Sequence, residues 1–362
     1  MDFRERIRKG LNGDYKGLKN GLNRINKYIF NTQRGCYYLL GGLSGSFKTT
    51  FADFILINAL EDAEVQGVPI NVFYYSFEID ELSKRANWTS VLIYNKYGIV
   101  VPPEKIKGLG DFRLNEDEQK LVEDVYDELE RLFSKINWVW ESTNPTGIYR
   151  EIWSFMEKRG SFEKESYTDE HGEVKERIVR FIPNDPNEYN ILLIDTYQLM
   201  KLEGRNGKLF NIKENIDKMS EYGIGLRNIF GLTLFFISQF NQGLSSVDRQ
   251  RFKEVDISPQ QNDFKDSTSP YADADVVIGL MNAHKMDMKT CLGYSINQDF
   301  ETYNLKWRFL LMKIIKNRLS RDNICIGLFV KPEAGSFEEL KPANELTHKD
   351  IEQLNKMING QI

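Results

Sequence analysis

Histidine and cysteine are both scarce in this sequence, with three of each among 362 residues. The histidines are scattered, and the cysteines show no metal-ligand spacing. These absences argue against a zinc site and against catalysis by a histidine-based triad. Cys36 and Cys325 lie in apolar, strand-like runs, so we interpret them as core residues of a protein from a reducing compartment.

Long hydrophobic stretches are also missing. The sequence has no run of about 18 apolar residues, so no membrane span is expected, and residues 1–10 lack the apolar segment of a signal peptide. The net charge of −5 shows no overall excess of basic residues. Any contact with nucleic acid is therefore expected to come from local loops and not from the charge of the whole chain.

The most informative stretch is a glycine-rich turn between an apolar, strand-like run and a run with helical spacing. It follows the phosphate-loop pattern G-x-x-x-x-G-K-[ST] from Gly42 to Thr49, apart from one position. Glycines let backbone N–H groups surround phosphate oxygens, Lys48 supplies charge for the β- and γ-phosphates, and the Thr49 hydroxyl can hold Mg²⁺. The predicted nucleotide-binding residues of this turn are Gly42, Leu43, Ser44, Gly45, Ser46, Phe47, Lys48, Thr49 and Thr50.

Phe47 stands where the pattern has its last glycine. Backbone and phosphate approach closely at that position, so the substitution weakens the match. We expect Gly45 to provide the turn and Phe47 to enter the first helical turn at negative φ. An ordinary glycine-rich turn that binds nothing is the alternative interpretation.

Polar residues end three further apolar runs that are typical of buried strands. Glu78 is interpreted as the base that orients and deprotonates a water molecule, or alternatively as a helix cap, a role that Asp80 fills better. Asp195 is interpreted as a Mg²⁺ ligand, or alternatively as a cap of the next turn. Gln239 is expected to lie near the γ-phosphate and to sense it.

Two other segments carry candidate binding residues. Residues 241–269 are polar with interleaved charges, including Arg249 and Arg251, and form either a solvated loop or a loop that faces DNA. Two strands near the carboxyl end are expected to be joined by a segment containing Lys316 and Arg318. This Lys-x-Arg sequence is either a simple turn or a tip that reaches the nucleotide of a neighbouring subunit.

Apolar, strand-like runs alternate with helical segments along most of the chain. This order predicts an α/β fold with a mostly parallel central sheet and helices on both faces. Ligands of such sheets bind at the carboxyl ends of the strands, where we expect all the candidate residues to lie. We further predict an amphipathic helix in residues 101–136, a surface hairpin or flexible insertion in 159–188, a strand beginning at 272, and a loop with a short helix in 283–304.

The sequence resembles the C-terminal, RecA-like ATPase domain of DnaB-type replicative helicases. The resemblance extends from about Gly17 to Leu340, with insertions, and its motifs occur in the order of the family. The matching segments are residues 17–22, the glycine-rich turn, 76–79 with Arg85, 194–200, 237–241, 264–268, 272–277 and 316–318. Among phosphate-loop ATPases, Asp273-Ala-Asp-Val-Val277 and the Lys-x-Arg sequence are specific to this family.

The resemblance implies an ATP- and Mg²⁺-dependent DNA helicase of the RecA-like P-loop NTPase fold that forms a ring, usually a hexamer. ATP would lie at subunit interfaces, where Lys316 and Arg318 would act on the γ-phosphate of the neighbour, and Arg85 would belong to the nucleotide site. The residues that would line the central channel and hold single-stranded DNA by its backbone are Lys265, Asp266 and Thr268.

The expected organisation is an arm at residues 1–16, an ATPase domain at 17–340 and a helical tail at 341–362. The arm is either a frayed, solvated segment or a helix, broken near Gly13, that docks on a neighbouring subunit. The usual N-terminal domain of the family is not found, which suggests a phage or mobile-element protein in a bacterial or phage-infected cytoplasm, with primase or a helicase loader as a further partner. The alternative functions are a RecA-like recombinase or recombination mediator, and a non-catalytic ATP-binding scaffold or loader.

Overall fold

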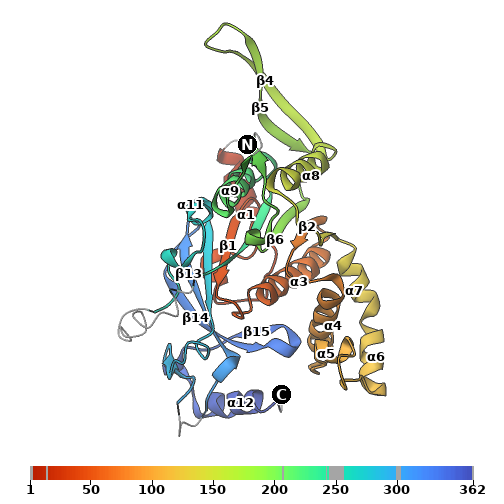
Figure 1. The fold of residues 1–362 in the computed structure, drawn as a ribbon, viewed down its shortest axis with the longest axis vertical. Coiled ribbons are helices and arrows are strands. Elements are labelled where there is room, and N and C mark those ends of the chain that lie inside the picture. Colours follow the sequence, from red (N-terminus) through yellow and green to blue (C-terminus); the bar gives the residue numbers. More distant parts are fainter. Residues whose placement is uncertain are drawn as a thin grey trace.

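A sheet of nine strands runs through the computed structural model, which describes residues 3–13, 15–205, 208–241, 243, 257–298 and 303–360 (Figure 1). The strand order is β15-β14-β13-β10-β1-β9-β6-β2-β3. The neighbours from β10 to β3 pair in parallel, as the alternation of strands and helices predicts. These strands are β10 (Val276–Met281), β1 (Tyr37–Gly42), β9 (Thr233–Gln239), β6 (Tyr189–Asp195), β2 (Ile70–Ser76) and β3 (Ile136–Val139).

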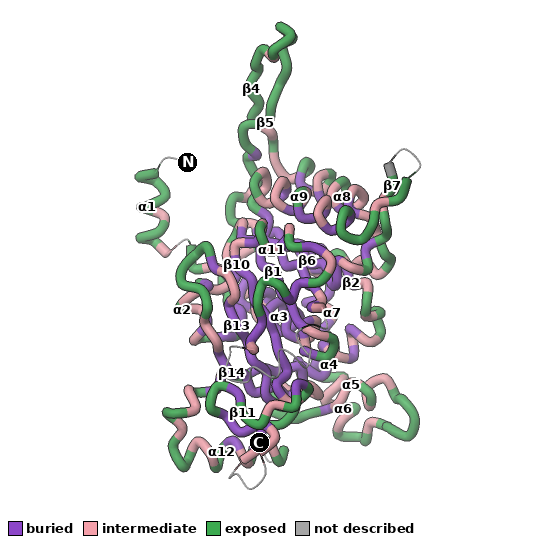
Figure 2. The backbone as a smooth tube through the Cα atoms, turned by 60° about the vertical axis from the view of Figure 1, so that its left-hand side comes forward, coloured by how far each residue is buried: buried purple, intermediate pink, exposed green. Residues whose placement is uncertain are grey.

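Helices cover both faces of this parallel part, so its central strands are buried on both sides (Figure 2). Alternate side chains of β1 show the two faces, because Tyr38 and Leu40 join one hydrophobic cluster and Tyr37 and Leu39 join the other. Burial on both faces explains why these strands appear in the sequence as continuous apolar runs. The covering helices are α3 (Lys48–Gln66) and α4 (Glu81–Tyr97) on the first face, and α8 (Pro145–Glu157) and α9 (Ile212–Phe230) on the second.

The sheet continues beyond β10 in antiparallel strands, namely β13 (Phe309–Asn317), β14 (Ile324–Lys331) and β15 (Ser336–Glu339). Two local expectations here were wrong. The strand expected to begin at 272 starts only at Val276, because residues 269–273 form α11 (Ser269–Asp273). In place of a short helix, the described part of 283–304 contains the strand pair β11 (Thr290–Cys291) and β12 (Tyr294–Ser295).

The segment 101–136 contains three helices instead of the single amphipathic helix that we expected. They are α5 (Pro103–Ile106), α6 (Glu116–Asp124) and α7 (Tyr126–Phe133). Val125 separates the last two, since its ψ of 0° interrupts the helical path. The side chain of Val125 is buried together with Leu129 and Leu132. The helix breaks at Val125 so that these apolar side chains can be buried, which explains why the segment is not one continuous helix.

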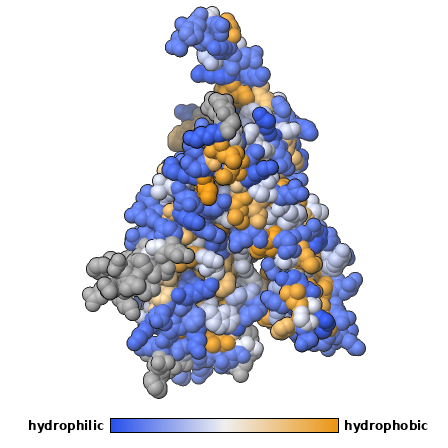
Figure 3. All heavy atoms as spheres, viewed as in Figure 1, coloured by the Kyte–Doolittle hydropathy of each residue, from blue (hydrophilic) through white to orange (hydrophobic). Residues whose placement is uncertain are grey.

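A long two-stranded hairpin, β4 (Gly160–Thr168) and β5 (Val174–Pro183), projects from the body of the molecule (Figure 1). The prediction of a surface hairpin for residues 159–188 is confirmed. Polar side chains cover most of its tip (Figure 3). Facing residues on the two strands form ion pairs, including Glu165 with Arg177 and Glu163 with Arg180, which support a ribbon that buries little apolar surface.

The two ends of the chain differ in how they contact this body. The expected amino-terminal helix is present as α1 (Phe3–Asn12), which contains no buried residue and stands apart from the core (Figure 2). In contrast, Leu354 and Met357 of α12 (His348–Ile358) are buried in the second hydrophobic cluster. No helix in the described part of the chain is both long and apolar enough to cross a membrane. Further short elements are α2 (Asn26–Ile29), β7 (Gly204–Arg205) and β8 (Lys208–Leu209).

Candidate nucleotide-binding site

The glycine-rich loop, residues 42–50, connects the carboxyl end of β1 to the start of α3. Its backbone is tightly folded at Gly42, where a Cβ atom would lie 2.2 Å from Ser46 Oγ and 2.9 Å from the Leu280 carbonyl oxygen. Ser46 closes the turn by donating from its hydroxyl to the Leu43 carbonyl oxygen at 2.7 Å. A close cradle of backbone at a helix start is suited to a phosphate group.

Phe47 does not adopt the conformation that we expected. Its φ is +60°, so the residue lies in the left-handed region immediately before α3, instead of entering the helix at negative φ. Gly45 has a φ of +70°, as expected of the residue that provides the turn, but position 47 is left-handed as well. A left-handed conformation costs a non-glycine residue about 1–2 kcal/mol. The Phe47 ring is half-buried against the first hydrophobic cluster, and this packing offsets part of that cost.

Three ionisable groups predicted from the sequence come together at the loop. Lys48 lies at the start of α3 and donates to the Leu43 carbonyl oxygen at 3.0 Å. Burial lowers the pKa of Lys48, and the negative charges of Glu78 and Asp195 oppose that shift. Asp80, and not Glu78, caps α4 by accepting from the Ser83 N–H at 2.9 Å, so the exposed Glu78 carboxylate is not used as the cap.

Asp195 and Thr49 form the part of the site that suits a metal ion. The Thr49 hydroxyl donates to Asp195 Oδ2 at 2.6 Å, while Oδ1 is buried without a hydrogen-bond partner. Burial raises the pKa of Asp195 to about 6, with the nearby Lys84 charge acting in the opposite direction. A buried, unpaired carboxylate oxygen beside a threonine hydroxyl fits the hard oxygen ligands that Mg²⁺ prefers. These residues therefore fit a Mg²⁺ ion.

The end of β9 links the glycine-rich loop to the candidate DNA-binding segment. Gln239 pairs in register with Gly42 of β1, which places it beside the loop. The end of β9 and the residue after it contact residues 263–265. The Lys265 N–H donates to the Gln239 carbonyl oxygen at 3.2 Å, and the Phe240 and Phe264 rings pack edge to face. A movement of the Gln239 backbone would thus displace Lys265 directly.

The candidate DNA-binding residues are only partly described. Lys265 and Thr268 are exposed, and Asp266 is half-buried with φ of +70°. These three residues lie together between β9 and α11. Arg249 and Arg251 lie outside the described residues.

Lys316 and Arg318 lie at the opposite edge of the sheet from the glycine-rich loop. β13 runs antiparallel to β10, so Lys316 pairs with Val277 near the start of β10, whereas Gly42 pairs with Leu280 near its end. Three steps of strand already separate the two sites by roughly 10 Å. The expectation that every candidate residue lies at one edge was therefore wrong, because it assumed a parallel strand here.

The side chains of Lys316 and Arg318 rest on carbonyl oxygens near the end of α11. Lys316 Nζ donates to the carbonyl oxygens of Tyr271 and Ala272 at 2.8 and 2.7 Å. Arg318 donates to the carbonyl oxygens of Ala272 and Asp273 at 2.8 and 3.2 Å, and its side chain remains 50% exposed. Both cations are thus held away from the nucleotide site of their own chain.

Arg85 was expected in the nucleotide site, but its contacts lie elsewhere. Its guanidinium donates to Glu81 at 2.8 Å, pairs with Glu130 of α7 and lies 4.5 Å above the Phe133 ring. The structure therefore places this arginine between α4 and α7. The carboxylate of Glu130 comes from the segment 101–136, which we could not connect to Arg85 from the sequence.

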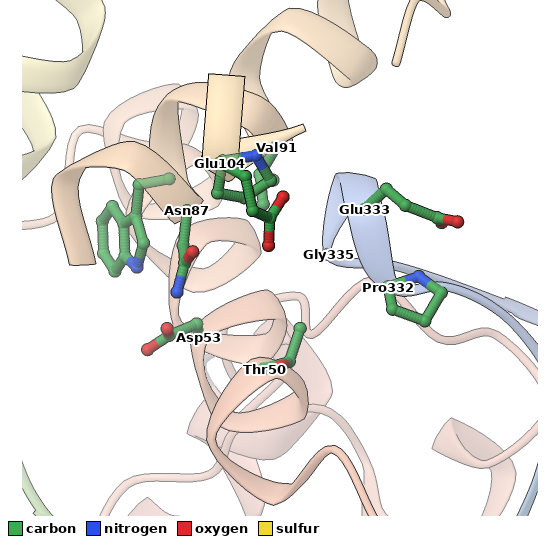
Figure 4. A pocket seen from close by; sticks show the side chains of 10 residues that line it. Thr50, Asp53, Asn87, Val91, Glu104, Pro332, Glu333 and Gly335 are labelled. Atoms are coloured by element: carbon green, nitrogen blue, oxygen red, sulfur yellow. The ribbon is translucent and has the colours of Figure 1, made fainter. Parts of the chain in front are cut away.

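A cleft of about 230 Å³ opens beside the first turn of α3 (Figure 4). Thr50 lines it directly after the glycine-rich loop, and Asn87 of α4 and Glu104 of α5 face it from the other side. Glu333 and Gly335, which follow β14, form a further wall. Sequence reasoning missed this cleft, because its walls come from segments that are distant along the chain.

A buried charge pair next to this cleft was also missed. Lys84 of α4 is fully buried and pairs with Asp53 of α3 at 2.9 Å. The Tyr74 hydroxyl donates to Asp53 at 2.9 Å and lies 2.9 Å from Lys84 Nζ. The group ties α3, β2 and α4 together immediately behind the glycine-rich loop. A charged residue inside a predicted helix normally indicates a solvated face, so no pattern in the sequence pointed to this pair.

Comparison with solved structures shows a known fold. The chain resembles "The Structure Of A DnaB-Like Replicative Helicase And Its Interactions With Primase", with a TM-score of 0.65 and 16% identity over 94% of this chain and 68% of that one. It also resembles a second solved ATPase domain, with a TM-score of 0.63 and 17% identity over 94% of this chain and 99% of that one. No family model and no curated protein sequence matches. The chain therefore shares the α/β fold of these two solved structures.

Proposed function

We propose that this protein is an ATP-driven DNA helicase, a motor that translocates on single-stranded DNA and unwinds duplex DNA at a replication fork. The observation that carries the proposal is the pairing of β9, in which Gln239 lies beside the glycine-rich loop and also bonds to Lys265. A motor needs a direct link between the state of the nucleotide and the position of its DNA contacts. The scaffold alternative does not require such a link.

The nucleotide would bind with its phosphates in the glycine-rich loop and its base in the cleft lined by Thr50. Lys48 and the loop N–H groups would hold the phosphates, and Thr49 and Asp195 would hold Mg²⁺, which neutralises phosphate charge when bound. Glu78 would accept a proton from a water molecule as that water attacks the γ-phosphorus. The bond to the oxygen bridging the β- and γ-phosphates then breaks, which releases ADP and phosphate.

Assembly into a ring, most simply a hexamer, would complete the site. Lys316 and Arg318 face away from their own glycine-rich loop, and a ring could bring them to the nucleotide of a neighbour. Helix α1 would dock on an adjacent subunit, because its exposed side chains include Phe3, Ile7 and Leu11 on one face. Primase or a helicase loader is the further partner that this function would require.

The first test concerns the proposed base. Glu78→Gln should bind ATP with nearly unchanged affinity, but its kcat for hydrolysis should fall by about 10²–10⁴-fold, the usual contribution of a general base. The matched control is Glu81→Gln, which makes the same change three residues later, at a carboxylate that pairs with Arg85. Normal turnover by Glu78→Gln would refute the assignment.

The second test concerns the coupling to DNA. Single-stranded DNA should stimulate ATP hydrolysis, and Lys265→Ala should weaken DNA binding and reduce the slope of log affinity against log salt by about one phosphate contact. Lys158→Ala, which changes an exposed lysine directly after α8, is the control. Nucleotide binding without hydrolysis, with or without DNA, would favour the scaffold. Open helical filaments on DNA in electron micrographs would favour the recombinase.

A further inference from the structure

The connection after β10 brings a lysine against the glycine-rich loop. A Cβ atom built on Gly45 would lie 1.9 Å from Lys285 Nζ and 3.2 Å from its Cε. Real Cβ atoms do not approach other atoms so closely, so the Lys285 ammonium can occupy this position only because residue 45 is glycine. The left-handed φ of +70° at Gly45 is a separate reason for glycine at the same site.

The backbone that carries Lys285 is anchored on both sides. Ala283 is fully buried and Met286 is 6% exposed, and both belong to the second hydrophobic cluster. The Lys285 N–H donates to the buried Asn282 side chain at 3.2 Å, and the Met288 N–H donates to the Ala283 carbonyl oxygen at 3.1 Å. An exposed lysine is therefore presented to the loop from a fixed base, which reduces the entropy lost when it binds a ligand.

The charges around Lys285 favour an anion. Among the described residues, its ammonium has no ion-pair partner within 4.0 Å. Burial is the main cause of the lowered pKa of Lys48, and the positive charge of Lys285 adds to that shift. Two ammonium groups close enough to interact repel each other unless an anion lies near both. The ammonium of Lys285 lies against the glycine-rich loop, whose backbone is suited to a phosphate group.

We propose that Lys285 is a second lysine of the nucleotide site, one that binds a phosphate group beyond the α-phosphate. This inference rests on the proposed function, because it assigns an additional contact to the same nucleotide. The contact would form with bound nucleotide before any bond breaks. Lys285 would therefore strengthen the binding of substrate and of transition state to a similar degree. Loss of the Lys285 side chain should then raise KM and leave kcat nearly unchanged.

The test compares Lys285→Ala with Lys289→Ala, which removes the same charge from an exposed lysine four residues later. Lys285→Ala should weaken binding of ATP and ADP roughly tenfold, the order expected for one charge-assisted hydrogen bond, and should leave AMP binding unchanged. The KM for ATP should rise by a similar factor with kcat within about twofold. Lys285→Arg should retain part of the affinity, because it keeps the positive charge.

Several outcomes would overturn the inference. Equal nucleotide affinities for Lys285→Ala and Lys289→Ala would show that Lys285 makes no contact. A fall in kcat at unchanged KM would assign Lys285 to the chemical step instead of ground-state binding. These outcomes differ from a failure of the proposed function. If folded wild-type protein binds neither ATP nor ADP, both the proposed function and the role of Lys285 are refuted. If wild-type protein binds nucleotide and the two variants do not differ, only the role of Lys285 is refuted.

Discussion

At the scale of single residues, the buried pair of Lys84 and Asp53 makes a sharp prediction for stability. Lys84→Met leaves the Asp53 carboxylate buried with only the Tyr74 hydroxyl, so the free energy of unfolding should fall by about 3–5 kcal/mol. The double variant Asp53→Leu/Lys84→Met removes both charges and should recover most of that loss. Urea unfolding measures the difference.

The double variant is the informative control for this pair. If it is as unstable as the single variant, the loss comes from altered packing and not from an unpaired charge. Recovery would show that the pair contributes little net stability and serves mainly to hold α3 and α4 in register behind the glycine-rich loop.

Asp195 predicts a pH dependence at the same scale. Burial raises its pKa from 3.8 to about 6, so the folded state binds this proton more tightly than the unfolded chain does. The stability associated with it is present below about pH 4 and is lost as the pH rises through about 6. In buffer without Mg²⁺ or nucleotide, Asp195→Asn should therefore be more stable than wild type near pH 8, by up to about 3 kcal/mol.

Melting temperatures at several pH values test this prediction. The advantage of Asp195→Asn should shrink as the pH falls from about 6 toward 3.8, below which the wild-type carboxyl group becomes neutral in both states, while hydrolysis is lost at every pH. A constant difference between the two proteins across the pH range would show that the charge of Asp195 is not its cause. The buried amide N–H of asparagine, if unpaired, would reduce the gain by about 1–3 kcal/mol.

At the scale of elements, α1 presents an apolar stripe with no partner among the described residues. Phe3, Ile7 and Leu11 are 74%, 49% and 83% exposed and lie four residues apart, on one face of the helix. If α1 docks on a neighbour, Ile7→Gln/Leu11→Gln should weaken association by at least about 100-fold, because burial of each of the two side chains contributes about 1.5–3 kcal/mol. Sedimentation velocity across a concentration series measures the effect.

Glu5→Gln is the control for this experiment, since it changes an exposed residue on the opposite face of the same helix. The expected result is that only the stripe variant shifts toward monomer and loses DNA-stimulated hydrolysis in parallel. If the stripe variant assembles like wild type, the alternative interpretation of α1 as a frayed, solvated arm is favoured.

At the scale of the whole molecule, the residues proposed to complete one nucleotide site lie at two opposite edges of the sheet. The glycine-rich loop, Glu78 and Asp195 lie at one edge, and Lys316 and Arg318 lie at the other. Arg318→Ala and Glu78→Gln should each be nearly inactive alone, but their mixture should recover hydrolysis, because an Arg318→Ala subunit keeps its own Glu78 and receives Arg318 from a Glu78→Gln neighbour. Arginine residues in this role contribute about 10³–10⁵ in rate.

Arg321→Ala is the matched control for the mixing experiment, since it removes an exposed arginine from the turn that follows β13. Its mixtures with wild type should keep nearly full activity at every ratio. No recovery of hydrolysis in mixtures of Arg318→Ala with Glu78→Gln would contradict an action across the subunit interface.

Local patterns in the sequence were sufficient to predict the parallel part of the fold and the positions of several candidate residues near the glycine-rich loop. β6 ends at Asp195, as expected of an apolar run that stops at an acid. Such signals are local, because strands buried on both faces must be apolar and the carboxyl ends of parallel strands share one edge. In the structure Gln239 pairs with Gly42 at this edge.

Features that depend on contacts between distant segments emerged only from the folded structure. The antiparallel direction of β13 moved Lys316 and Arg318 to the far edge, and no local pattern encodes the direction in which a strand joins a sheet. The cleft beside Thr50, the Asp53–Lys84 pair and the approach of Lys285 to Gly45 each join residues more than 30 positions apart. Because these contacts form only when distant segments pack together in the fold, spacing along the sequence does not reveal them.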